Sequence, residues 1–89
     1  MIPPAARDDL IRRLRKIEGQ TQGIQRMLLD GRECREVHNQ LASVRAATRR
    51  VSLELMKYYA QTCLSDPECL RSEQAVNQVI SLLLDGKDG

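Results

Sequence analysis

Residues 33–63 read ECREVHNQLASVRAATRRVSLELMKYYAQTC, and most of the expected architecture follows from this segment. Its apolar and threonine side chains recur in alternating steps of four and three residues, which is the spacing of a helix with one apolar face. No Gly or Pro interrupts the chain between Gly31 and Pro67. We therefore expect one long helix over about residues 33–63. The apolar face comprises Val37, Leu41, Val44, Thr48, Val51, Leu55, Tyr58 and Thr62.

A first helix is predicted before this segment, because apolar side chains step in the same way from Leu10 to Leu28. Asp8 or Asp9 is expected in its first turn, where the helix dipole favours a carboxylate. Asp30-Gly31 is expected to end this helix, since glycine tolerates the left-handed conformation that commonly follows a helix.

A third helix is predicted after the long segment. Ser65 and Glu68 have the spacing of a capping box, and Pro67 is tolerated in a first turn, where its missing N–H costs nothing. Apolar residues between positions 75 and 83 continue this helix, which is expected to end before Asp85-Gly86.

The fold class predicted from these patterns is all-α, because no alternation of period two supports a strand. Three helices with a long central one form a single domain over residues 1–89. A helix as long as the central one must bury its apolar face against another chain. An antiparallel helical-bundle dimer provides that burial, and we expect this assembly.

The composition excludes several classes of protein. The chain has 89 residues, of which 42% are hydrophobic and 29% charged, as in ordinary globular proteins. No segment approaches the roughly 18 consecutive apolar residues of a membrane span, and the N-terminal residues lack the apolar stretch of a secretory signal. We therefore expect a cytoplasmic protein without a membrane partner. Its three cysteines, an odd number, are then typical of reduced thiols.

The net charge of +2 conceals an uneven distribution. Residues 1–57 carry a net charge of +5, and residues 58–89 carry a net charge of −3. The first two thirds of the chain therefore favour contact with nucleic acid, although solvated helix faces would explain the same charges.

Two cysteines mark the ends of the predicted long helix. Cys34 opens it and Cys63 closes it, so they lie roughly 43 Å apart along one chain. In an antiparallel dimer, Cys34 of one subunit would face Cys63 of the other. The alternative is that both are small buried side chains. Cys69 lies outside this geometry, and we expect it to be incidental.

The surroundings of Cys34 favour a reactive thiolate. The positive end of the helix dipole and the flanking Arg32 and Arg35 all favour the anion, although Glu33 and Glu36 oppose it. Cys63 lies at the negative end of the helix and is expected to be the poorer nucleophile.

Two segments of the chain resemble the CsoR/RcnR family of small all-helical bacterial transcriptional repressors. They are LIRRLRKIEGQTQGIQRMLLDGREC at residues 10–34 and QLASVRAATRRVSLELM at residues 40–56, and the resemblance extends over about residues 10–84. It implies an antiparallel dimer that pairs into a flat tetramer. It also implies binding to double-stranded operator DNA without a helix-turn-helix, and release of the DNA when an inducer modifies the cysteine site.

The resemblance also bears on the inducer. Copper sensors of this family carry a His four residues before the second Cys, whereas Tyr59 stands there in this chain. A phenol oxygen is a poor ligand for Cu(I), which prefers thiolates and imidazole. Two cysteines without that His resemble the persulfide-sensing branch, the CsoR-like sulfurtransferase repressors, which need no cofactor. Cys34 would then attack a persulfide or polysulfide inducer, and Cys63 of the partner would close a sulfur cross-link between the subunits.

An alternative inducer is Cu(I), bound by Cys34 and Cys63 with or without His38. His38 follows Cys34 by four residues and so lies over the same helix face. An isolated His on a charged helix is more often simply solvated.

A candidate DNA-binding surface combines two helices. Basic and polar side chains occupy one flank of the first helix, and further arginines lie on the long helix. Such a surface would contact phosphates and read DNA shape. The resemblance points most directly to Arg13 and Arg50. The full set is Arg12, Arg13, Lys16, Gln20, Arg45, Arg49 and Arg50.

Two functions of other classes have less support in the sequence. A thiol redox enzyme is disfavoured, because the chain has no Cys-x-x-Cys, no evident general base and no Gly-rich cofactor loop. The other is a helical scaffold with inert thiols, for which slow and unselective alkylation of Cys34 would be the sign.

Overall fold

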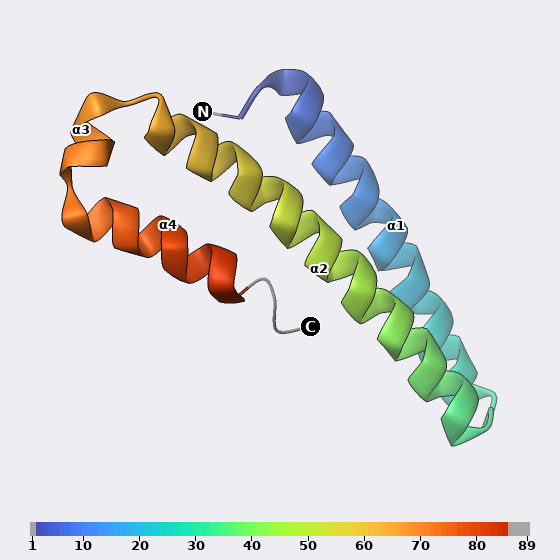
Figure 1. Cartoon of the computed structure of the whole chain (residues 1–89). Helices are drawn as coiled ribbons and strands as arrows, with labels where there is room; N and C mark the ends of the chain where they lie inside the picture. The colour runs from blue at the N-terminus through green and yellow to red at the C-terminus, as the bar shows by residue number, and fades with distance from the viewer. Residues whose placement is uncertain (1, 86–89) are drawn as a thin grey trace.

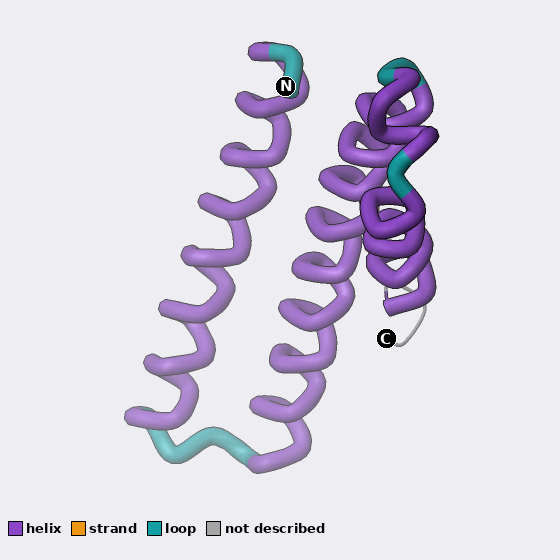
Figure 2. The backbone as a smooth tube through the Cα atoms, turned by 90° about the vertical axis from the view of Figure 1, so that its left-hand side faces the viewer, coloured by secondary structure: helices purple, strands orange, loops and turns teal. Residues whose placement is uncertain are grey.

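The computed structural model describes residues 2–85 and consists of helices joined by short turns (Figure 1). The helices are α1 (Pro4–Leu29), α2 (Cys34–Leu64), α3 (Pro67–Arg71) and α4 (Glu73–Asp85). No strand occurs among these residues, and the predicted all-α class is confirmed. α1 and α2 form an antiparallel hairpin, and α4 runs back along the C-terminal half of α2 on the side away from α1 (Figures 1 and 2).

The long helix forms as predicted, with 31 residues and no interruption. The turn before it depends on Gly31, which has a φ of +70°, a conformation that costs glycine little. The N–H of Arg32 donates to the carbonyl of Met27 at 3.0 Å, and the N–H of Asp30 donates to that of Arg26 at 2.8 Å. These bonds satisfy carbonyls at the end of α1 that would otherwise lack partners.

The first helix begins earlier than predicted. α1 starts at Pro4, whose fixed φ suits a first helical position, and the N–H of Arg7 donates to the carbonyl of Pro3 at 2.9 Å. The expectation that Asp8 or Asp9 lies in the first turn is therefore wrong. Both belong to the following turn, where Asp9 pairs with arginines instead.

The segment predicted as one third helix is two helices. Ser72 has an extended backbone (ψ 108°) that separates α3 from α4, and its Oγ accepts a hydrogen bond from the N–H of Ala75 at 3.2 Å. α3 is capped by Asp66 rather than by Ser65, because the Asp66 carboxylate accepts from the N–H of Glu68 at 3.0 Å. The starts of α3 and α4 are thus each fixed by a side chain that accepts a hydrogen bond from a backbone N–H in the first turn.

The chain is thin and has little interior. Its extents are 55 × 27 × 12 Å, and its radius of gyration is 17.1 Å, whereas a compact chain of this length would have about 12 Å. Large apolar side chains remain open to solvent, among them Leu41 at 50% and Ile80 at 48% exposure. No helix within residues 2–85 is long and apolar enough to cross a membrane. The buried side chains are Leu10, Ile24, Val37, Met56 and Cys63.

Candidate thiol site and basic groove

The two cysteines singled out from the sequence lie at opposite ends of α2. Cys34 is the first residue of the helix, and its thiol is free and exposed. Cys63 is in the last turn and is only 6% exposed. The two ends of α2 lie far apart (Figure 1), so a single chain does not bring these residues together.

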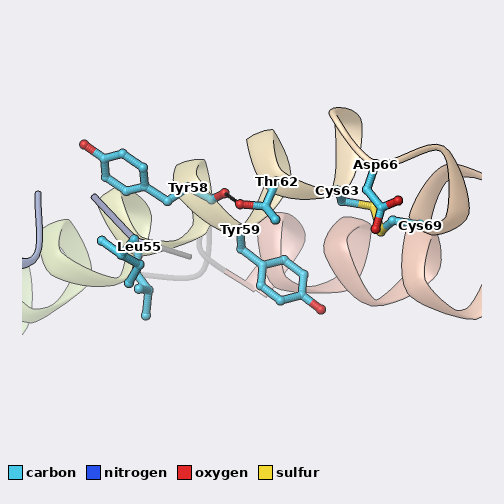
Figure 3. Close-up of a pocket in the computed structure, with 8 residues that line it drawn as sticks. Leu55, Tyr58, Tyr59, Thr62, Cys63, Asp66 and Cys69 are labelled. Carbon is cyan, nitrogen blue, oxygen red and sulfur yellow. Dashed lines mark hydrogen bonds between the residues drawn. A yellow bond between two sulfur atoms is a disulfide. The ribbon is translucent and has the colours of Figure 1, made fainter. Parts of the chain in front are cut away.

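Cys63 is instead joined to Cys69 by a disulfide bond (Figure 3). The expectation that Cys69 is incidental is wrong, because the turn at Ser65 and Asp66 between α2 and α3 brings Cys69 to Cys63. The expectation of reduced thiols is wrong for these two residues as well. The Cα atoms of the two cysteines are 5.2 Å apart, well within the usual range for a disulfide. The separation of six residues across a helix end is the sequence signal for this pair.

A mainly apolar cavity of about 280 Å³ lies beside the disulfide (Figure 3). Tyr59 lines it, and its hydroxyl donates to the side-chain oxygen of Gln78 on α4 at 3.4 Å. Tyr59 thus links α2 to α4, and Gln78 is a contributor that the sequence pattern did not indicate. The cavity lining comprises Ile2, Leu55, Tyr58, Tyr59, Thr62, Cys63, Asp66 and Cys69.

His38 lies at the other end of α2, near Cys34, and is exposed. It is therefore remote from Cys63 within one chain. Among residues 2–85, no three His, Cys, Asp or Glu side chains gather in an arrangement that could hold a metal ion. The alternative ligand set of Cys34, His38 and the partner's Cys63 spans two chains, and it stays a prediction.

The predicted basic surface forms a groove between α1 and α2. Five of the seven predicted residues line this basic groove, and its volume is about 520 Å³. Arg45 and Arg49 do not line it. The lining comprises Arg12, Arg13, Lys16, Ile17 and Gln20 from α1, with Ser43, Ala47 and Arg50 from α2.

Carboxylates fix the arginines of the groove. Asp9 accepts hydrogen bonds from Arg12 at 2.5 Å and Arg13 at 2.9 Å, and these bonds lower the pKa of Asp9 while Asp9 raises the pKa of Arg13. On α2, Glu54 accepts from Lys57 at 3.3 Å and Arg50 at 3.1 Å, and these bonds lower the pKa of Glu54. Exposed pairs of this kind contribute little stability, so their main effect is to orient the cations.

Gln20 adds an unmet hydrogen-bond requirement to the groove. Its side-chain oxygen is buried and has no hydrogen-bond partner among the described residues. Buried polar atoms without partners are uncommon in folded proteins, and they often mark a place for water or a ligand.

The fold and these two sites define a class: small, strand-free helical proteins that combine a basic groove with a cysteine site. Within this class the chain belongs to the metal-sensitive transcriptional repressor family, whose model matches residues 6–85. The resemblance to CsoR/RcnR repressors is confirmed, and the protein is a transcriptional repressor rather than an enzyme.

Two curated relatives are similar to the chain. The copper-sensing transcriptional repressor CsoR of Bacillus subtilis is 38% identical over 79 residues, which cover 89% of this chain and 75% of the relative. The copper-sensing transcriptional repressor RicR of Mycobacterium tuberculosis is 36% identical over 59 residues, which cover 66% of this chain and 62% of the relative. No solved structure matches the chain.

Proposed function

We propose that the protein represses transcription by binding operator DNA through the basic groove, and that Cu(I) bound at its cysteine site releases the DNA. The observation that carries the DNA-binding half is the gathering of Arg12, Arg13, Lys16 and Arg50 from two helices along one groove. Guanidinium and ammonium groups in such a row neutralise successive phosphates and release counterions. The unpartnered oxygen of Gln20 adds an acceptor that a base amino group or a water would satisfy.

The repressor acts as an assembly of antiparallel chains. A thin chain that leaves Leu41, Leu55 and Ile80 45–50% exposed needs a second copy to cover them. An antiparallel arrangement along α2 brings the Cys34 end of one chain to the Cys63 end of the next. Two equivalent cysteine sites per dimer follow from that symmetry.

Cu(I) is the inducer that the comparisons support. Both relatives described above are named copper-sensing repressors. The donor set of this chain also fits Cu(I), because Cys34 supplies a soft thiolate at one end of α2, and Cys63 supplies another at the other end once its disulfide with Cys69 is reduced. Tyr59 is not among the ligands, since its hydroxyl is a hard donor that already bonds Gln78.

The test uses the full-length, fully reduced protein and a pool of random duplexes, from which bound DNA is enriched over several rounds. We expect a preferred duplex, and we expect one equivalent of Cu(I) per chain to weaken its binding by at least about tenfold, a coupling of roughly 1.4 kcal/mol. Zn(II) serves as the control metal. Failure to enrich any duplex overturns the DNA-binding proposal, and an unchanged affinity with Cu(I) overturns the choice of inducer.

A persulfide is the second candidate inducer, and the observation that favours it is the free, exposed thiol of Cys34. The Cys34 thiolate would take the outer sulfur of a persulfide and release the corresponding thiolate. In reduced protein, where Cys63 is free of Cys69, the partner's Cys63 thiol would then attack the inner sulfur of the Cys34 persulfide, giving a disulfide between subunits and hydrogen sulfide. Intact-mass analysis separates the candidates, because the persulfide joins two chains covalently whereas Cu(I) is removed by a chelator. Failure to form linked chains with polysulfide removes this candidate.

A further inference from the structure

We infer that Cys63 and Cys69, once reduced, form a Cu(I)-binding dithiolate within a single chain, in which Cys69 supplies a ligand that Tyr59 does not. This inference rests on the proposed Cu(I) response and specifies its ligands. The two residues are adjacent, since their Cα atoms are 5.2 Å apart across the α2–α3 turn. Cys63 is buried and Cys69 is half-buried, and both line the cavity described above.

Backbone bonds hold the pair together independently of the sulfurs. The N–H of Asp66 donates to the carbonyl of Cys63 at 3.1 Å, and the N–H of Leu70 donates to the carbonyl of Asp66 at 3.1 Å. The Asp66 carboxylate also caps α3. Reduction of the disulfide removes none of these bonds, so the two thiols remain neighbours when the S–S bond is broken.

The local chemistry selects a soft ion of low coordination number. Cu(I) is stable with two thiolate ligands, whereas structural zinc takes four ligands. Within the described part of the chain, no third His, Cys, Asp or Glu side chain joins the pair to form a metal site. Two metal–sulfur bonds of roughly 2.3 Å separate the sulfurs by at most about 4.6 Å, a distance that rotation about the Cα–Cβ bonds provides. Leu55, Tyr58 and Tyr59 line the same cavity and make its surroundings mainly apolar.

The binding step balances without an oxidant. A dithiol reductant first converts the disulfide into two thiols and itself becomes a disulfide. One Cu(I) ion then replaces two protons, which leaves a complex with a single negative charge. Cys34 of an antiparallel partner is the remaining thiol available to a dimer as a third ligand, because each chain has three cysteines.

The experiment measures the Cu(I) affinity of the full-length, reduced protein by competition with a chromogenic Cu(I) chelator under anaerobic conditions. We expect Cys69→Ser to weaken binding by on the order of a hundredfold, since losing a group that merely supports a ligand already costs roughly 10- to 100-fold. Cys34→Ser removes the third thiolate that a partner offers, and it is expected to weaken Cu(I) binding less than Cys69→Ser does. The matched control combines Cys69→Ser with Gln61→Cys. This double variant has the original number of thiols, but the new thiol lies on a different face of α2, so its Cu(I) affinity is expected to remain low.

The outcomes separate this inference from the proposed function. Wild-type protein that binds no Cu(I) overturns both. Wild-type protein that binds Cu(I) while Cys69→Ser binds equally well overturns only the role of Cys69. If circular dichroism shows that a variant has lost helicity, the inference is tested instead by measuring the rate of cysteine alkylation in the wild-type protein. We expect Cu(I) to protect Cys63 and Cys69 together, and alkylation of Cys69 at an unchanged rate in the Cu(I)-loaded protein refutes the inference.

Discussion

Replacing Arg50 with Ala tests the basic groove most directly, because Arg50 is the basic residue that α2 contributes to its lining. Each phosphate contact contributes about 0.9 to the slope of log affinity against log salt concentration. If Arg50 makes one such contact, the slope becomes shallower by about 0.9 per chain and by about 1.8 for a bound dimer. Raising the salt concentration from 50 to 200 mM then lowers the DNA affinity of both proteins, and the factor of loss is about 12-fold smaller for the variant than for the wild-type dimer.

The assay is a fluorescence-anisotropy titration of the selected duplex over that salt range. Arg71→Ala is the matched control, because it removes the same charge from α3, outside the groove. Removing Arg50 leaves Glu54 paired with Lys57, so the local helix is expected to keep its structure. A slope equal to that of the wild type, or an equal change in Arg71→Ala, refutes the placement of DNA in the groove.

Three further results are expected. Asp9→Asn removes the carboxylate that pairs with Arg12 and Arg13. DNA affinity at low salt should then rise several-fold in the same anisotropy assay. A lower DNA affinity would contradict this electrostatic role of Asp9. Folding lowers the pKa values of Asp9 and Glu54, so their ion pairs stabilise the fold above the unfolded-state pKa values, and this stabilisation is lost as the pH falls through the folded-state pKa values. The urea midpoint should therefore decline below about pH 4. A decline centred near neutral pH would point to other groups. Gly31→Ala should lower the free energy of unfolding in urea by about 1 kcal/mol, because an L side chain at φ +70° is strained. No atom lies within 4 Å of the added methyl group, so the cost comes from the backbone alone. An unchanged urea midpoint would show that the turn adapts.

The long helix and the glycine turn were predictable because their signals are local. The apolar spacing of α2 and the absence of Gly and Pro fix a helix regardless of its partners, and Gly31 has the conformation expected after a helix. The division at Ser72 was missed because periodicity continues across a single capping residue. Asp66-Pro67 was the readable signal for the start of α3, since Asp is a strong helix cap and Pro suits the next position.

The candidate sites divide in a similar way. The basic groove was largely predictable, because residues three and four apart on α1 necessarily share a flank. The position of Arg50 relative to Arg45 and Arg49 depended on how α1 rotates against α2, which no local pattern specifies. The Cys63–Cys69 pair was missed for the same reason, since it depends on how sharply the chain reverses after α2.

The scarcity of buried side chains has a consequence for how the protein accumulates. Five buried residues among the described positions, none of them completely enclosed, give a lone polypeptide little interior, so in the assembly proposed above much of the stabilising burial would come only after two copies meet. With such an assembly, newly made chains at low abundance would be exposed to proteolysis, whereas chains made faster would pair and be protected. The amount of working repressor should consequently rise more steeply than its rate of synthesis, and a modest change in gene dosage should become a larger change in occupancy of the DNA.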